Sequence, residues 1–368
     1  MTTFAALFVP EEFREAVSDT AWLEGMLAAE LALARASGAV VDESAFDASL
    51  YDVDELCEAG RAAGNPVQPL VGALRARAGE DAHRGATSQD ILDTAAMLVA
   101  QRSLRLLDDE LAGLAAGCAA LADAHRATPM AGRTLLQQAV PVTFGLVAAG
   151  WLVAVLDARR RLDAVVLPAQ LGGAAGTLAS FGERGPEVLR LYAAELRLAE
   201  PALPWHAHRG PVWALAGALD AAGQAAAKIG LDVVLLAQTE VGEVSERDGG
   251  ASSTMPHKSN PVRAVLARAC ARAVHAQASL LTTGDHEHQR AAGAWHAEWS
   301  ALSEALAFAG GAVAAARECV EALDVHVDRM RANMTGDLRS EQRAFGSEGD
   351  YLGAANAFVD RALERQRA

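Results

Sequence analysis

Residues 249–263 read GGASSTMPHKSNPVR and separate two long, alanine-rich stretches of helical pattern. Pro256 and Pro261 have no amide hydrogen to donate and clash with a preceding helical turn, so a helix cannot continue through this stretch. Gly249 and Gly250 let the backbone bend. We therefore expect a polar loop between long helices. Such loops often carry catalytic groups, but an ordinary surface connection would have a similar composition.

The composition of the chain favours long, closely packed helices. Its 368 residues suffice for one large domain or two to three smaller ones, and 51% are hydrophobic although only 5% are aromatic. The net charge of −15 argues against a nucleic-acid partner, so an anionic substrate would need a local positive site. No signal peptide or membrane-spanning run is evident, which predicts a cytoplasmic protein that does not bind a membrane.

The four cysteines are widely separated and form no Cys-x-x-Cys pair, which predicts reduced thiols, most of them in the core. They are Cys57, Cys118, Cys270 and Cys319.

Several further segments have the apolar periodicity of helices. These helices are expected at 22–37, from about 88 to 125, from 129–145 onward to 161, at 212–246, at 262–281, across 301–334 and at 351–364. Between the last two, a polar loop is predicted at 335–350. Together these helices predict an all-α protein with a central bundle of long antiparallel helices.

Residues 83–94, HRGATSQDILDT, mark the start of the long helix that ends near residue 125. Thr87, Ser88 and Asp90 suit the N-terminus of a helix, and capping alone would explain them. Hydroxyl groups beside the free amides of a helix start also form a natural carboxylate site.

The loop at 249–263 resembles the signature loop of the fumarase/aspartase superfamily, G-S-S-x-M-P-x-K-x-N-P. The match runs from Ser252 to Pro261, and Ala251 stands where the family has glycine. The resemblance implies a flexible loop that closes over an anionic substrate. It makes Ser252 the acid/base that exchanges a proton with a substrate carbon. The implied substrate contacts in this loop are Ser253, Met255, Lys258 and Asn260.

Two other segments are similar to the 3-carboxy-cis,cis-muconate cycloisomerase branch of that superfamily. Residues 83–94 resemble its form of the first signature region, and residues 287–299 resemble E-H-x-R-x-x-G-x-W-H-A-E-W. The resemblance implies that Thr87 and Ser88 bind a substrate carboxylate, with His83 nearby. Arg84 replaces a tryptophan common in that branch, and its role stays open.

Residues 132–139 resemble the second signature region, G-Y-T-H-x-Q-P-A, but Leu135 replaces its histidine. Val265 replaces the glutamate that pairs with that histidine in fumarases. Amine or hydroxide leaving groups need a proton from a general acid. A carboxylate leaves unaided, because the pKa of its conjugate acid is about 4. The double loss therefore favours lactone chemistry.

Arg133, Thr134 and Gln137 in this region are expected to contact substrate. Arg133 can bind a carboxylate with two parallel hydrogen bonds, but a salt bridge at a helix start would also explain it.

Three other motifs carry weaker signals. The glycine-rich residues 167–182 only loosely match a dinucleotide-binding loop. His206 and His208 lack further metal ligands, and loop histidines of this kind are usually solvated. The spacing of His286, His288, His296 and Glu298 matches no closed zinc pattern.

Arg209 matches a family arginine and is expected to touch substrate.

The sequence thus predicts an N-terminal helical domain at 1–85, a central long-helix bundle at 86–335 and a reduced C-terminal segment at 336–368. The resemblance implies a homotetramer whose sites combine three subunits, and no cofactor or metal. It implies cycloisomerisation of 3-carboxy-cis,cis-muconate in protocatechuate catabolism, the β-ketoadipate pathway. An adenylosuccinate-type lyase and a non-catalytic structural homologue remain alternatives.

Overall fold

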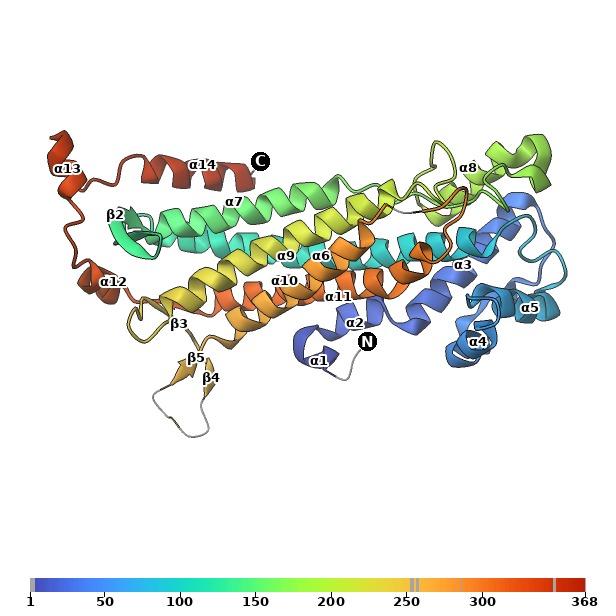
Figure 1. The fold of residues 1–368 in the computed structure, drawn as a ribbon, viewed down its shortest axis with the longest axis horizontal. Coiled ribbons are helices and arrows are strands. Elements are labelled where there is room, and N and C mark those ends of the chain that lie inside the picture. Colours follow the sequence, from blue (N-terminus) through green and yellow to red (C-terminus); the bar gives the residue numbers. More distant parts are fainter. Residues whose placement is uncertain (1–3, 252–254, 256–257, 285, 347–348, 368) are drawn as a thin grey trace. The chain divides into compact units, whose positions relative to one another are not determined.

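The computed structural model describes residues 4–251, 255, 258–284, 286–346 and 349–367, and it is mainly α-helical (Figure 1). Within these residues the strands form short antiparallel pairs, β1 with β2, β3 with β6 and β4 with β5. The predicted all-α class with long bundle helices is confirmed.

The chain divides into two compact units, each assembled from three segments. The first contains Met1–Leu106, Ala164–Gly217 and Ala276–Ala307, and the second contains Leu107–Asp163, Ala218–His275 and Phe308–Ala368. Four long helices contribute residues to both units: α6 (Ser88–Ala124), α9 (Gly210–Leu236), α10 (Val262–Leu281) and α11 (Ala294–Glu321). The boundaries predicted at 85 and 335 follow chain order rather than packing, so they remain predictions.

The first unit is organised around α3 (Asp19–Ser37), which packs against α8 (Gly185–Leu196). The Ser18 side chain accepts a hydrogen bond from the Ala21 amide and so caps the start of α3. Gly25 lies so close to α6 that a methyl group there would come within 3.1 Å of the Ala95 Cβ. The remaining elements of this unit are α1 (Ala5–Phe8), α2 (Glu11–Ala16), η1 (Glu43–Phe46), η2 (Ala48–Leu50), α4 (Val53–Gly60), α5 (Val67–Ala78) and η3 (Ala179–Arg184).

The second unit is a helical bundle built around α7 (Phe144–Asp163). Trp151 of α7 donates a 2.8 Å hydrogen bond to Asp232 of α9. Close helix packing continues at Gly230, where a Cβ would lie 2.6 Å from the Ala264 carbonyl oxygen of α10. The other elements here are β1 (Pro129–Thr134), β2 (Gln137–Thr143), β3 (Val244–Glu246), β4 (Gly250–Ala251), β5 (Ser259–Asn260), β6 (Leu323–Val325), α12 (Val327–Asn333), α13 (Ser340–Phe345) and α14 (Ala355–Arg367).

The prediction of a helix that begins within 129–145 is wrong for the first part of this segment. Strands β1 and β2 form an antiparallel hairpin there, and α7 begins only at Phe144. Pro141 cannot sit inside a helix, and the surrounding valines and threonines favour strands. Leu135 and Leu136 form the two-residue turn with φ of 50° and 64°. Such positive φ values suit the tight turn of a hairpin.

Other predicted boundaries also shift. Helix α9 ends at Leu236 rather than at 246, and β3 follows it to pair with β6. The helical pattern predicted across 301–334 is therefore interrupted by β6. The loop predicted at 335–350 contains the short helix α13, and the last helix begins at Ala355. The pairing of β3 with β6, which lie far apart in the chain, accounts for the first two of these differences.

The sequence pattern predicts no membrane-spanning run, but α11 is long and apolar enough to span a membrane by length and composition alone. Most of its apolar window, 72%, is buried inside the protein. That burial is typical of a core helix.

The four cysteines differ in exposure, which predicts a selective alkylation pattern. Burial raises the pKa of the Cys118 and Cys270 thiols to about 12 each and also raises that of Cys319. Partial burial raises the pKa of Cys57 as well, but this residue is exposed, contrary to a core position. Because only an accessible thiolate reacts quickly, we expect iodoacetamide at pH 8.5 to label Cys57 alone in the folded protein. Peptide mass spectrometry would check this. Equal labelling of Cys118 without denaturant would contradict the buried arrangement.

Candidate functional site

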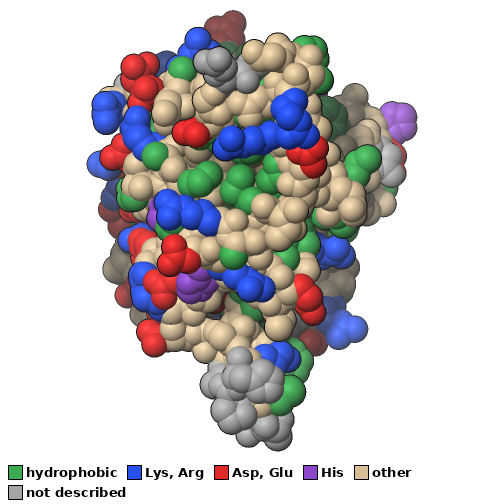
Figure 2. All heavy atoms as spheres, turned by 90° about the vertical axis from the view of Figure 1, so that its left-hand side faces the viewer, with side chains coloured by type: hydrophobic (Ala, Val, Ile, Leu, Met, Phe, Trp, Pro, Cys, Tyr) green, Lys and Arg blue, Asp and Glu red, His purple; other side chains and the backbone are tan. Residues whose placement is uncertain are grey.

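One face of the molecule carries charged side chains of both signs (Figure 2). Figure 2 shows basic and acidic side chains interspersed over one face of the molecule, with apolar side chains between them. Binding of an anion to a chain with a net charge of −15 must therefore depend on local groups. Apart from Arg209, the predicted site residues lie on three separate stretches of the chain.

The first stretch is fixed by the buried carboxylate of Asp90. Its Oδ2 accepts hydrogen bonds from the amides of Thr87 and Gly173, both at 2.9 Å. Its Oδ1 accepts the Gly172 amide at 2.8 Å and lies 2.7 Å from His206 Nε2. Asp90 thus caps the start of α6 and ties it to the glycine-rich segment, which serves here as a structural partner of α6.

His206 was expected to be solvated, and this prediction is wrong. Its side chain is only 3% exposed because it packs against the buried Asp90. A short-range pattern cannot reveal this contact, since the two residues are far apart in the chain.

Arg290 is a candidate site residue that sequence reasoning missed. Its Nη1 donates a hydrogen bond to the Thr87 hydroxyl. No other side-chain partner of Arg290 is found among the described residues, so its guanidinium keeps donors available for an anion. The signal was present in the E-H-x-R segment, where the neighbouring histidines are more conspicuous.

Within 4–251, 255, 258–284, 286–346 and 349–367, no cluster of His, Cys, Asp and Glu is placed to hold a metal.

Arg209 lies in a buried ionic network rather than at an open surface. Its Nη1 and Nη2 donate to the two oxygens of Asp93 at 2.7 and 2.9 Å, and its Nε donates to Glu298 at 3.1 Å. Glu298 also lies 3.2 Å from His286 Nε2. Burial raises the pKa of the Glu298 carboxyl, although hydrogen bonds from Arg209 oppose this. These contacts support a role for Arg209 in joining α6 to α11, and substrate contact stays only a prediction.

The second stretch is the β1–β2 hairpin, where Arg133 is engaged by the chain itself. Its Nη1 and Nη2 donate to the two oxygens of Glu243 at 3.0 and 2.6 Å. The Glu243 side chain is fully buried and also accepts a 2.8 Å hydrogen bond from Asn333. The salt-bridge alternative for Arg133 is thus present, although on a strand rather than at a helix start. Thr134 and Gln137 are exposed near the turn.

A paired substitution separates the two roles of Arg133. Arg133→Met alone should cost about 3 kcal/mol, because it leaves a buried carboxylate without its cation. Arg133→Met with Glu243→Leu should return to within about 1 kcal/mol of wild type, because no buried charge remains. Urea unfolding would measure both. We expect the double variant to keep its KM within about threefold. A stable double variant with a much larger KM would instead support substrate binding by Arg133.

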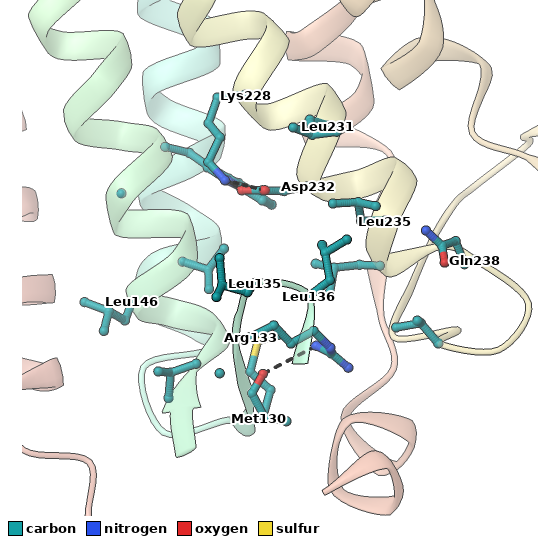
Figure 3. A pocket seen from close by; sticks show the side chains of 18 residues that line it. Met130, Arg133, Leu135, Leu136, Leu146, Lys228, Leu231, Asp232, Leu235 and Gln238 are labelled. Atoms are coloured by element: carbon teal, nitrogen blue, oxygen red, sulfur yellow. Dashed lines mark hydrogen bonds and ion pairs between the residues drawn. The ribbon is translucent and has the colours of Figure 1, made fainter. Parts of the chain in front are cut away.

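A groove of about 720 Å³ lies beside this hairpin (Figure 3). Leu135 and Leu136 stand at it with exposures of 96% and 75%, and Leu231 and Leu235 of α9 line its wall. Its described cations are already paired, Lys228 with Asp232 and Arg133 with Glu243. The groove is therefore poorly suited to a polycarboxylate.

The residues at the two replaced positions are both solvent-exposed. Leu135 lies at the hairpin turn, and Val265 in the first turn of α10 is 50% exposed. They do not form a buried apolar pair that would replace the lost histidine and glutamate. Neither side chain can donate a proton, so these positions supply no general acid.

The third stretch is the signature loop, whose arms pair as β4 and β5. Asn260 donates its side-chain amide to the Gly250 carbonyl at 3.0 Å, which links the arms. Met255 and Lys258 are exposed, and the Lys258 amide donates to the Met255 carbonyl. Ser252 and Ser253 lie outside the described residues, so their predicted roles stay predictions.

Comparisons with known proteins give the same assignment as the signature stretches. A family model described as a lyase matches residues 32–275. A nitrosuccinate lyase of Streptomyces davaonensis is 46% identical over 93% of this chain and 79% of that protein. A 3-carboxy-cis,cis-muconate cycloisomerase of Pseudomonas aeruginosa is 44% identical, covering 90% and 77%. The solved 3-carboxy-cis,cis-muconate lactonizing enzyme of Pseudomonas putida superposes with a TM-score of 0.90 and 33% identity over 99% of both chains.

Proposed function

Because the chain belongs to this lyase family, within the fumarase/aspartase superfamily, we propose that it cycloisomerises 3-carboxy-cis,cis-muconate to its carboxylated muconolactone. The proposal is supported by relatives named for that reaction at 36–44% identity. The choice of substrate is supported by these relatives together with the solved lactonizing enzyme, which superposes with a TM-score of 0.90, and Leu135 supports the class of reaction. An exposed leucine stands where amine-expelling members hold a histidine, so the favoured reaction is one whose leaving or adding group is a stable anion.

In the proposed reaction, an oxygen of one substrate carboxylate forms a C–O bond to a carbon of the conjugated double bond. The electron pair of that double bond moves onto the neighbouring carboxylate, which becomes an aci-carboxylate. Ser252 then delivers a proton to the carbon that lies between the newly bonded carbon and the aci-carboxylate. This step completes the lactone. In reverse, Ser252 removes that proton and the ring carboxylate leaves.

The negative charge that develops must be met by hydrogen-bond donors already in place, which is commonly the largest catalytic contribution. At the first stretch these donors are the hydroxyls of Thr87 and Ser88 and the guanidinium of Arg290. Lys258 is proposed to contribute from the loop. Asn260 is proposed to keep the loop arms together, in line with its hydrogen bond to Gly250.

A second candidate is elimination from a nitrosuccinate, which the 46% identity to a nitrosuccinate lyase favours. Breaking the C–N bond of that substrate would release nitrite, which is also a stable anion and needs no general acid. Leu135 therefore fits this reaction as well as the lactonisation. It disfavours an adenylosuccinate-type reaction, in which an amine departs.

We further propose a cytoplasmic homotetramer that acts in protocatechuate catabolism. The groups that the reaction needs lie on separate stretches of the sequence, and the family resemblance implies sites that combine several subunits. Superfamily enzymes of this kind act on small carboxylates and are typically oligomeric.

A substrate panel tests the proposal. Initial rates would be measured with 3-carboxy-cis,cis-muconate, nitrosuccinate and adenylosuccinate under identical conditions. The proposal expects kcat/KM for the first to exceed the others at least about tenfold, a difference of roughly 1.4 kcal/mol in transition-state binding. A preference for nitrosuccinate would replace it with the second candidate. A folded protein with no turnover of any of the three would favour the non-catalytic alternative.

A further inference from the structure

A buried carboxylate on α3 lies against the histidine of the first signature stretch. The side chain of Glu30 is fully buried, and its Oε1 lies 2.6 Å from His83 Nδ1. Its Oε2 has no hydrogen-bond partner among the described residues. Ala29 and Leu33, which flank it along α3, are almost wholly buried, and the buried Tyr192 lies within electrostatic range. A carboxylate in such surroundings is costly unless it is paired, so its contact with His83 calls for an explanation.

The His83 side chain is fixed by its contact with Glu30 but remains partly exposed to solvent. It is 14% exposed, and its backbone has a φ of 60°, a strained value for a residue with a side chain. Strain of this kind persists where the surroundings impose it and is common at functional sites. Nδ1 is occupied by Glu30, so Nε2 is the ring nitrogen left for another molecule.

A second histidine–carboxylate contact in the same unit has a different character. His206 is 3% exposed, and its partner Asp90 also accepts three backbone amides. Both oxygens of Asp90 are thus engaged within the protein, and this buried contact serves packing. In the contact between Glu30 and His83 the imidazole is partly exposed, and within the described part of the chain the carboxylate has one hydrogen-bond partner. Such a contact fixes the tautomer of a histidine that acts on another molecule.

We propose that Glu30 is a positioning residue, which holds His83 through Nδ1–H so that Nε2 faces a substrate carboxylate at the first signature stretch. His83 precedes Thr87 by four residues, and the Thr87 hydroxyl accepts a hydrogen bond from Arg290. Several hydrogen-bond donors therefore lie on or beside this stretch. The inference rests on the proposed function, because it takes His83 as a contact for substrate. It adds Glu30, which acts only through His83.

A double-mutant cycle tests whether Glu30 acts through His83. Glu30→Gln keeps the size of the side chain but removes the charge, and it should lower kcat/KM by about 10–100-fold. In a His83→Asn background the same change should lower it less than twofold, because the group being positioned is gone. Glu30→Asp should retain more activity than Glu30→Gln. Equal losses in both backgrounds would overturn the proposal and assign Glu30 to packing.

A chemical readout keeps this test independent of turnover. Diethylpyrocarbonate modifies unprotonated imidazole nitrogens, and peptide mass spectrometry can follow His83 in the full-length protein. We expect tricarballylate, used as a tricarboxylate probe, to protect His83 in wild type. Glu30→Gln should speed modification several-fold, because Nδ1 also becomes available. Unchanged modification and protection in Glu30→Gln would overturn the positioning role even if the enzyme acts on another substrate.

Discussion

Replacement of Arg209 by methionine is expected to lower the free energy of unfolding by about 3–5 kcal/mol, because it breaks a buried ionic network. The guanidinium is 2% exposed and donates to both Asp93 and Glu298, which are themselves buried. Methionine would leave two carboxylates close together without a cation. Desolvation already raises the pKa of Glu298, so the loss of Arg209 would favour its protonation further.

Urea unfolding followed by circular dichroism would measure this effect. Arg102→Met is the matched control, because Arg102 pairs with Glu24 at the surface with exposures of 51% and 48%. That pair should contribute less than about 1 kcal/mol. If Arg209→Met does not fold, adding Asp93→Asn and Glu298→Gln should restore part of the stability. A cost for Arg209→Met no larger than that of the Arg102 control would refute the buried network.

Ser252→Ala should lower kcat by about 10²–10⁴-fold, the range expected for loss of a positioned acid/base. Stability should change little, since the substitution removes one hydroxyl from a loop. The effect should appear in kcat more than in KM, because the proton is transferred only in the transition state. Steady-state kinetics with the preferred substrate would check this.

Ser259→Ala is the control, because Ser259 is an exposed serine of the same loop on β5 and has no proposed role. It should retain kcat within about twofold. Equal losses from both serine substitutions would point to general disturbance of the loop. Full activity of Ser252→Ala would remove Ser252 from the mechanism.

The helices could be predicted from the sequence where apolar periodicity alone determines them. Helix α10 agrees with its prediction at both ends, and α6 ends within a residue of its predicted limit. The β1–β2 hairpin was missed because alanine and leucine around its turn conceal the strand preference of its valines and threonines. The ends of α9 and α11 depend on the pairing of β3 with β6, a contact between distant segments that no local pattern encodes.

The signature residues could be named from the sequence, but not their partners. Nothing near Glu30 or Asp90 in the chain indicates that each faces a histidine, because those contacts join different elements. Arg209 and Arg133 were each expected to contact substrate, and each is also paired with a buried carboxylate that no local pattern indicates. A sequence motif indicates which residues matter. The fold decides whether an arginine faces a ligand or a neighbouring carboxylate.

Incubation of the purified protein with 3-carboxy-cis,cis-muconate in D₂O, followed by proton NMR, tests the central proposal most directly. Lactonisation predicts loss of the diene signals and a muconolactone that carries one deuterium at the carbon protonated by Ser252. The deuterium identifies the proton-transfer step as well as the product. Unchanged diene signals with a folded, oligomeric protein would contradict the proposed reaction.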